Sequence, residues 1–98
     1  MASYVIVDVD IRDSERYRAY MREAPRLIQK HGGEYLVRGG QVEIMEGTWE
    51  PHRLVLLRFP DVQAVRALLS DPEYLPLKAI RHECAQTDIV AMEGIEAR

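Results

Sequence analysis

The sequence is poor in several residue types, and each scarcity excludes a class of protein. Cys84 is the only cysteine, so no disulfide can form within the chain. The 13 lysines and arginines are interleaved with 16 aspartates and glutamates, and the net charge of −3 leaves no basic stripe for nucleic acid. No apolar run reaches membrane-spanning length, and the N-terminus MASYVIVDVD lacks the features of a signal peptide. We therefore expect a cytoplasmic protein that contacts neither nucleic acid nor a membrane.

Motifs for cofactors, metals and nucleophilic catalysis are also missing. The sequence contains no phosphate-binding loop and no GxGxxG, GxSxG or HExxH pattern. His82, Glu83 and Cys84 are consecutive on a predicted helix, so their side chains fan around it and cannot converge on one metal ion. Cys84 has no evident base beside it and is expected to be a small buried apolar residue. We expect neither a cofactor nor a metal site.

What the sequence does contain is the composition of an ordinary globular domain. Of its 98 residues, 47% are hydrophobic and 30% are charged. A chain of this length buries a modest core. We expect residues 1–98 to form a single domain, with residues 94–98 as a flexible tail.

Hydrophobic periodicity predicts four strands and two helical regions. Period-two alternation with β-branched residues indicates strands, and apolar residues at three- and four-residue spacing indicate helices. The expected strands are 3–11, 34–47, 53–59 and 87–94, and the expected helices are 13–33, 60–69 and 70–85. Asp13 and Asp61 are suitable N-caps. Pro25 should kink or divide the first helix. Gly39 and Gly40 should mark a bend or bulge in the second strand.

This order of elements predicts an α+β, ferredoxin-like βαββαβ fold. Four antiparallel strands would form the sheet, both helical regions would pack on one face, and the first and third strands would be central. The valines of the first strand, with Val55, Leu57 and Phe59 of the third, would face the helices.

Helices on one face leave the other face of the sheet open. That face would carry Tyr4, Ile6, Asp8, Leu54, Leu56 and Arg58. An apolar sheet face exposed to water is a liability, and a second copy packed sheet against sheet is the simplest cover. The sequence therefore predicts a homodimer.

Several segments together resemble a known family. YVIVDVDIRDSERYRAY, HGGEYLVRGG, EGTWEPHRLVLLRFP and SDPEYLPLKAIR resemble, in order and spacing, the small bacterial family of domain of unknown function 1330. The resemblance extends from Tyr4 to Gly94, although Leu68 and Leu69 stand where an aromatic residue is expected. It implies a dimeric α/β-barrel built from two facing sheets. That superfamily includes cofactor-free monooxygenases, lactone isomerases, haem enzymes and binding proteins, so the resemblance assigns no reaction.

Arg38 is the first candidate ligand-binding residue. It stands just before the Gly39–Gly40 pair, and strand parity would place it on one face with Leu36, Val42 and Ile44. An inward-pointing guanidinium needs an anion or several acceptors. It could hold a carboxylate or enolate of a small ligand, or it could pair with Asp8 or with a glutamate of a partner chain.

Further candidates lie on the predicted dimer face and in the following turn. Asp8 and Arg58 could be a buried pair that fixes the dimer register, or an acid/base and an anion anchor. Trp49 could form a lid over a pocket or cover the edge of the partner subunit. Glu46 could be a base or a solvated side chain at a strand end.

Tyr74 and Arg81 lie seven residues apart on the last predicted helix and so share one face. They could reach a cleft beside the sheet, or they could be a half-buried tyrosine and a surface arginine.

These residues support three function hypotheses. The leading one is a dimeric barrel that binds a small anionic organic molecule in one pocket per protomer, with cofactor-free chemistry carried by Arg38 and a proton moved by Asp8, Glu46 or Tyr74. The alternatives are a non-catalytic binding or sensing module and a structural homodimer that has no ligand.

Overall fold

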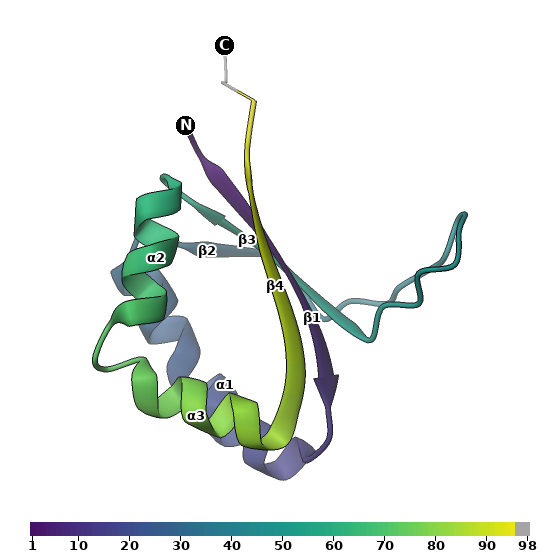
Figure 1. The fold of residues 1–98 in the computed structure, drawn as a ribbon, viewed down its shortest axis with the longest axis horizontal. Helices are drawn as coiled ribbons and strands as arrows, with labels where there is room; N and C mark the ends of the chain where they lie inside the picture. Colours follow the sequence, from purple (N-terminus) through teal and green to yellow (C-terminus); the bar gives the residue numbers. More distant parts are fainter. Residues whose placement is uncertain (96–98) are drawn as a thin grey trace.

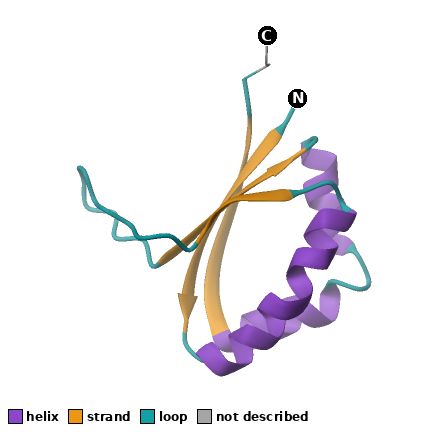
Figure 2. Ribbon diagram, turned by 180° about the vertical axis from the view of Figure 1, so that it is seen from behind, coloured by secondary structure: helices purple, strands orange, loops and turns teal. Residues whose placement is uncertain are grey.

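The structure, a computed structural model, describes residues 1–95 and contains four strands and three helices. The elements are β1 (Ser3–Ile11), α1 (Ser14–Lys30), β2 (Glu34–Arg38), β3 (Arg53–Phe59), α2 (Val62–Ser70), α3 (Leu75–Cys84) and β4 (Ala85–Glu93). The strands form one twisted sheet (Figure 1), and the helices all lie on one side of it (Figure 2). The predicted ferredoxin-like fold is confirmed. Residues 96–98 of the predicted tail lie outside the described part of the chain.

The sheet has the strand order β2-β3-β1-β4, and every neighbouring pair is antiparallel. The first and third strands are therefore central, as predicted. None of the three helices has the length and the apolar character that crossing a membrane requires.

The helix-facing side of the two central strands forms the floor of the core. Val5 and Val9 of β1 and Val55, Leu57 and Phe59 of β3 are all buried. Their partners from the helices include Leu27, Ile28, Val65, Leu68 and Leu77. The predicted assignment of these strand residues to the helix side is confirmed.

The opposite face of the sheet, which we call the open face, is not covered by any element within residues 1–95. Ile6 pairs in register with Leu56 of β3 and Val90 of β4, so these three side chains share that face. Val90 and Met92 are 55% and 49% exposed. The open apolar face predicted from the sequence is therefore present in the protomer.

Helix α1 runs without a break from Ser14 to Lys30, although the sequence predicted a kink or division at Pro25. Its N-cap is Asp13, whose side chain accepts a hydrogen bond from the N–H of Arg16 at 3.1 Å. The helix is not divided, because its buried face extends on both sides of the proline and this packing outweighs one lost backbone hydrogen bond. The chain leaves the helix through Gly32, whose φ is +80°.

The second helical region breaks at Asp71, so α3 begins at Leu75 and not at residue 70 as predicted. The Asp71 carboxylate is buried and accepts hydrogen bonds from Lys30 Nζ at 2.8 Å, His31 Nε2 at 2.7 Å and the N–H of Glu73 at 2.8 Å. Together these bonds hold the pKa of Asp71 well below its usual range, and the hydrogen bond from Lys30 contributes most. Asp71 thus ties the end of α1 to the turn between α2 and α3.

Strand β2 is shorter than predicted, because it ends at Arg38 and does not continue to Gly47. Strand β3 begins at Arg53, so residues beyond Gly39 have no strand to pair with. The β-bulge lies at Leu36, where the register shifts, and not at the predicted glycine pair. Residues 40–51, which we call the arm, project from the sheet on the side away from the helices (Figures 1 and 2).

Replacing Asp71 should destabilise the protein in a pH-dependent way. A carboxyl whose pKa is lowered by folding stabilises the folded state above its ordinary pKa of 3.8, and this contribution is lost as the pH falls toward the lower folded value. Asp71→Asn should therefore lower the thermal unfolding midpoint at pH 7, and the difference from wild type should shrink below about pH 4. Glu15, an exposed residue of α1, provides the control, since Glu15→Gln should shift the midpoint far less than Asp71→Asn does. A wild-type advantage that is constant with pH would contradict this account.

Candidate functional site

A cavity of about 70 Å³ lies between the helix-facing side of the sheet and the helices. This volume is several times what a single water molecule needs. Most of its walls are apolar, contributed by Val5, Val7, Val9, Met21, Ile28, Val55, Leu57, Phe59, Val65, Leu68, Leu69 and Ile89. Its polar lining consists only of tyrosines and arginines: Tyr17, Tyr20, Tyr35, Tyr74, Arg38, Arg53 and Arg81. No aspartate, glutamate or histidine is among the lining residues.

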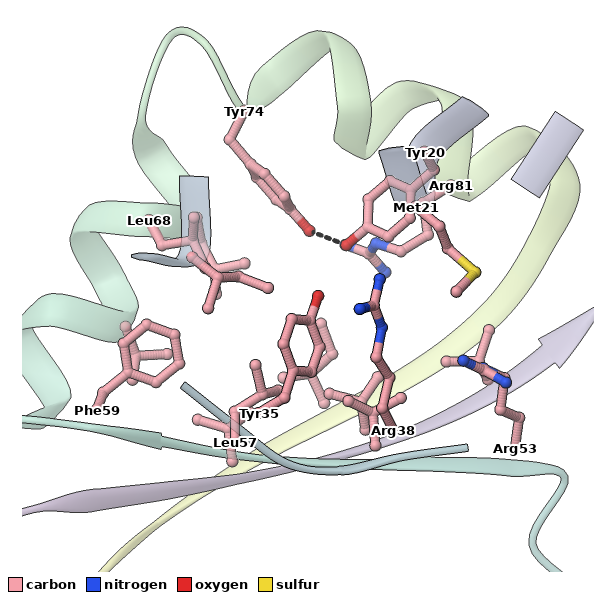
Figure 3. Close-up of a pocket in the computed structure, with 18 of the residues that line it drawn as sticks. Tyr20, Met21, Tyr35, Arg38, Arg53, Leu57, Phe59, Leu68, Tyr74 and Arg81 are labelled. Carbon is pink, nitrogen blue, oxygen red and sulfur yellow. Dashed lines mark hydrogen bonds between the residues drawn. The ribbon is translucent and has the colours of Figure 1, made fainter. Parts of the chain in front are cut away.

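The three arginines reach the cavity from three different elements. Arg38 comes from β2, Arg53 from β3 and Arg81 from α3, and Figure 3 shows Arg38 and Arg81 extending toward one another across the cavity. Arg81 is only 4% exposed. The Nε atoms of Arg53 and Arg81 are buried and have no hydrogen-bond partner among the described residues. A buried guanidinium without a carboxylate is costly, so this arrangement favours an incoming anion.

The β-bulge at Leu36 brings Tyr35 and Arg38 to the same side of the sheet. Residues three apart in a regular strand point to opposite faces. The extra residue in the bulge shifts the alternation by one position and puts both side chains on the same face. Tyr35 then pairs with Leu57 and Arg38 pairs with Val55, both of which face the helices. The guanidinium carbon of Arg38 lies 4.6 Å from the centre of the Tyr35 ring, a cation–π contact. Since Arg38 is exposed, it stands at the mouth of the cavity.

Gly39 leaves room for the Arg53 guanidinium. A Cβ atom on Gly39 would lie 2.0 Å from Arg53 Nη1, and the φ of +70° at this position also favours glycine. The guanidinium therefore packs directly against the backbone at the end of β2. This close approach explains one glycine of the pair that follows Arg38.

Two tyrosines form a hydroxyl pair inside the cavity. The hydroxyl oxygens of Tyr20, on α1, and Tyr74, just before α3, are 2.7 Å apart (Figure 3). Burial, with a smaller contribution from Tyr74, strongly raises the pKa of Tyr20, and burial also raises the pKa of Tyr17 and Tyr35. These three phenols stay protonated at neutral pH. They can donate hydrogen bonds to an oxyanion but cannot accept its proton.

Three of the six predicted ligand-binding residues meet at this cavity, namely Arg38, Tyr74 and Arg81. The predicted facing of Arg38 with Leu36 is wrong, because the bulge reverses the parity of the strand. Val42 and Ile44 lie beyond the end of β2, so strand parity does not relate them to Arg38. Tyr74 and Arg81 are 3% and 4% exposed, so the interpretation as a half-buried tyrosine and a surface arginine does not hold.

Asp8 and Arg58 lie on the open face, as predicted, but do not pair with each other. Asp8 accepts a hydrogen bond from the N–H of His52 at 2.9 Å, and Arg58 Nη1 lies 3.5 Å from Glu34 Oε1. Because the sheet separates this face from the cavity, neither residue reaches the cavity of its own protomer. Asp8 is therefore not the partner of Arg38 within one chain.

Trp49 and Glu46 lie in the arm and do not line the cavity. Trp49 is 60% exposed, and Glu46 is also exposed. Within residues 1–95, no three histidine, cysteine, aspartate or glutamate side chains gather to hold a metal ion.

Sequence reasoning missed Arg53 and the tyrosines Tyr17, Tyr20 and Tyr35 as cavity residues. Arg53 could have been found, because it precedes Val55 by two positions and strand parity places both on the helix side. Tyr17 and Tyr20 have the three-residue spacing of one apolar helix face, but this spacing alone does not show that their hydroxyls would share a cavity.

The chain belongs to a family described as domain of unknown function DUF1330, which matches residues 2–95. Comparison with curated proteins gives no match.

Solved structures share the fold at low sequence identity. A protein of unknown function from Rhodopseudomonas palustris, RPA0582, is 17% identical with a TM-score of 0.79, covering 98% of this chain and 84% of that one. SnoaB, a cofactor-independent oxygenase from Streptomyces nogalater, is 9% identical with a TM-score of 0.67, covering 98% and 95%. A dimeric ferredoxin-like protein of unknown function from Jannaschia sp. CCS1 is 15% identical with a TM-score of 0.64, covering 96% and 100%. At these identities the likeness carries the fold and no activity.

Removing the buried charge of Arg81 should stabilise the ligand-free protein. Arg81→Met keeps the length of the side chain and removes a guanidinium that has no carboxylate partner, so the free energy of unfolding should rise by about 1–3 kcal/mol. Chemical denaturation without added ligand measures this change. The matched control is Arg18→Met, which removes an exposed charge of α1 and should shift the value by less than about 0.5 kcal/mol. A large loss of stability in Arg81→Met would show that Arg81 stabilises the fold and is not held there for a ligand.

Proposed function

We propose that the protein binds a small organic anion in the cavity between the sheet and the helices. The observation that carries this proposal is the lining itself, which contains Arg38, Arg53 and Arg81 but no carboxylate. Arginine stays protonated in proteins, so the charges of these side chains require an acceptor from elsewhere. The apolar walls favour a ligand whose anionic group is attached to a hydrophobic body.

The structural alternative, in which these arginines pair with carboxylates of the same chain, has little support. Arg38 and Asp8 lie on opposite faces of the sheet, and no ion pair involving Arg38, Arg53 or Arg81 occurs within residues 1–95. A glutamate from the arm of a second copy is the remaining protein acceptor, since the arm carries Glu43, Glu46 and Glu50. The experiment below separates this acceptor from a small anion.

We also propose that two copies pack with their open faces together. The open face is apolar and uncovered, and the arm projects on the same side while exposing Met45 and Trp49 at 86% and 60%. The description of the Jannaschia protein as dimeric and ferredoxin-like supports this arrangement. The cavity lies on the helix side, so each protomer keeps its own binding site.

We propose binding and not proton-transfer catalysis, because no carboxylate, histidine or lysine side chain lines the cavity. Of the proton carriers that the sequence offered, Asp8 and Glu46 lie outside the cavity, whereas Tyr74 lines it with its hydroxyl bonded to that of Tyr20. The raised pKa values keep Tyr17, Tyr20 and Tyr35 protonated. A ligand must therefore arrive already ionised. The name of SnoaB states a cofactor-independent oxygenase activity for that protein. For the present chain, the cavity supports anion binding. Simple binding and such chemistry both require that an anion be held.

Thermal unfolding with a panel of carboxylates, phenolates and phosphate esters tests the proposal, with the neutral amide, ether or alcohol of each compound as a reference. At about ten times its Kd, a ligand adds about 1.4 kcal/mol to the stability and raises the midpoint by about 6–11 °C. Wild type should respond to an anion and not to its neutral reference. Arg81→Met should lose this response.

Arg18→Met is the matched control, because Arg18 is an exposed residue of α1 that does not line the cavity. This variant changes the net charge equally and should respond like wild type. The proposal fails if no anion shifts wild type, or if Arg81→Met responds as wild type does. An anion response that wild type lacks and that appears when Glu43, Glu46 and Glu50 are all changed to glutamine would identify the arm of a second copy as the acceptor.

A further inference from the structure

The cavity offers two separate positions for negative charge. Arg38 and Arg81 extend toward one another from the sheet and from α3, while Arg53 stands apart from them, against the backbone of Gly39 (Figure 3). The hydroxyl pair of Tyr20 and Tyr74 lies beside Arg81 and adds one donor to the first position, because the other O–H is used in the bond between the two tyrosines. The second position has its own buried donor, since Arg53 Nε has no partner among the described residues.

We propose that the ligand is a dianion, with one anionic group held by Arg81 and Arg38 and a second held by Arg53. This inference rests on the proposed function and specifies the class of ligand for the same cavity. The Nε atoms of Arg81 and Arg53 are both buried and unbonded within residues 1–95. Each guanidinium can thus present its Nε–H edge, with an adjacent Nη–H, to the two oxygens of one carboxylate or phosphate group.

The charge balance favours two negative charges over one. Arg38, Arg53 and Arg81 together bring three positive charges to a mostly apolar cavity, and no lining residue carries a negative charge. One monoanion would leave at least two guanidiniums without a counter-charge, and Arg81 is too buried to rely on water. A dianion leaves only one, and exposed Arg38 at the mouth is the residue that solvent can stabilise.

A dicarboxylate and a phosphate monoester share this chemistry and differ in the spacing of their charges. A dicarboxylate places two groups apart on one carbon skeleton and suits two separated positions. A phosphate monoester concentrates both charges at one end and would engage Arg81 and Arg38 alone. Because Arg53 stands apart from the other two arginines, the geometry points to the dicarboxylate.

Calorimetric titration of matched compounds at constant ionic strength tests this inference. The probes are benzoate and phthalate, pentanoate and glutarate, and phenyl phosphate. A dicarboxylate should bind wild type at least about tenfold more tightly than its monocarboxylate partner, a difference of about 1.4 kcal/mol. Phenyl phosphate should fall between the two.

The residue assignment is tested with variants of Arg53. Arg53→Met should bring the dicarboxylate down to the affinity of the monocarboxylate while leaving the monocarboxylate within about twofold of wild type. Arg53→Lys keeps the positive charge but lacks the planar guanidinium, so it should retain part of the preference for the dicarboxylate. Arg66→Met, which removes an exposed charge on α2, should retain all of it. Circular dichroism of each variant establishes that it is folded, and Arg53→Lys decides the assignment if Arg53→Met does not fold.

The outcomes separate this inference from the proposed function. Equal affinities for the mono- and dicarboxylates would overturn the dianion and leave anion binding intact. Tighter binding of phenyl phosphate than of both dicarboxylates would also overturn it, because it would place both charges at one position. Absence of binding by every probe would overturn the dianion and the anion site together.

Discussion

The charge of Arg81 is held inside the protein without a carboxylate to balance it, and the character of the site follows from this constraint. The side chain is 4% exposed, its Nε has no partner among the described residues, and apolar side chains form most of the surrounding walls. Such a group destabilises the empty protein, and an anion relieves that cost when it binds. The packed core of β1, β3 and the helices, together with the hydrogen bonds of Asp71, supplies the stability that offsets the cost of burying Arg81.

The two faces of the sheet have different roles. The helix side closes over the cavity, and the open face exposes apolar side chains. Strand β2 contributes to the cavity, because its bulge at Leu36 turns Tyr35 and Arg38 toward it. Gly39 then makes room for Arg53 and directs the chain into the arm. A few residues at one sheet edge thus build both the mouth of the cavity and the start of the arm, which projects on the side away from the helices.

Much of the fold could be predicted, because alternation and helical spacing are local signals. The facing of Val55, Leu57 and Phe59 and the exposed apolar face follow from the period of two. The bulge at Leu36 and the end of β2 could not be predicted in the same way, because they depend on where β3 begins. The break at Asp71 depends on Lys30 and His31, which are distant in sequence. Arg38, Tyr74 and Arg81 were identified by residue type and spacing, but their meeting point was not.

The most direct test of the account is nuclear magnetic resonance of the arginine Nε–H groups during addition of the tightest-binding anion. A new hydrogen bond to an oxyanion moves the proton of the donor downfield and slows its exchange with water. The account predicts that Arg81 changes in this way on saturation, whereas exposed Arg18 and Arg66 do not. An Arg81 resonance that is protected before the anion is added, and that does not move when the anion binds, would contradict the account.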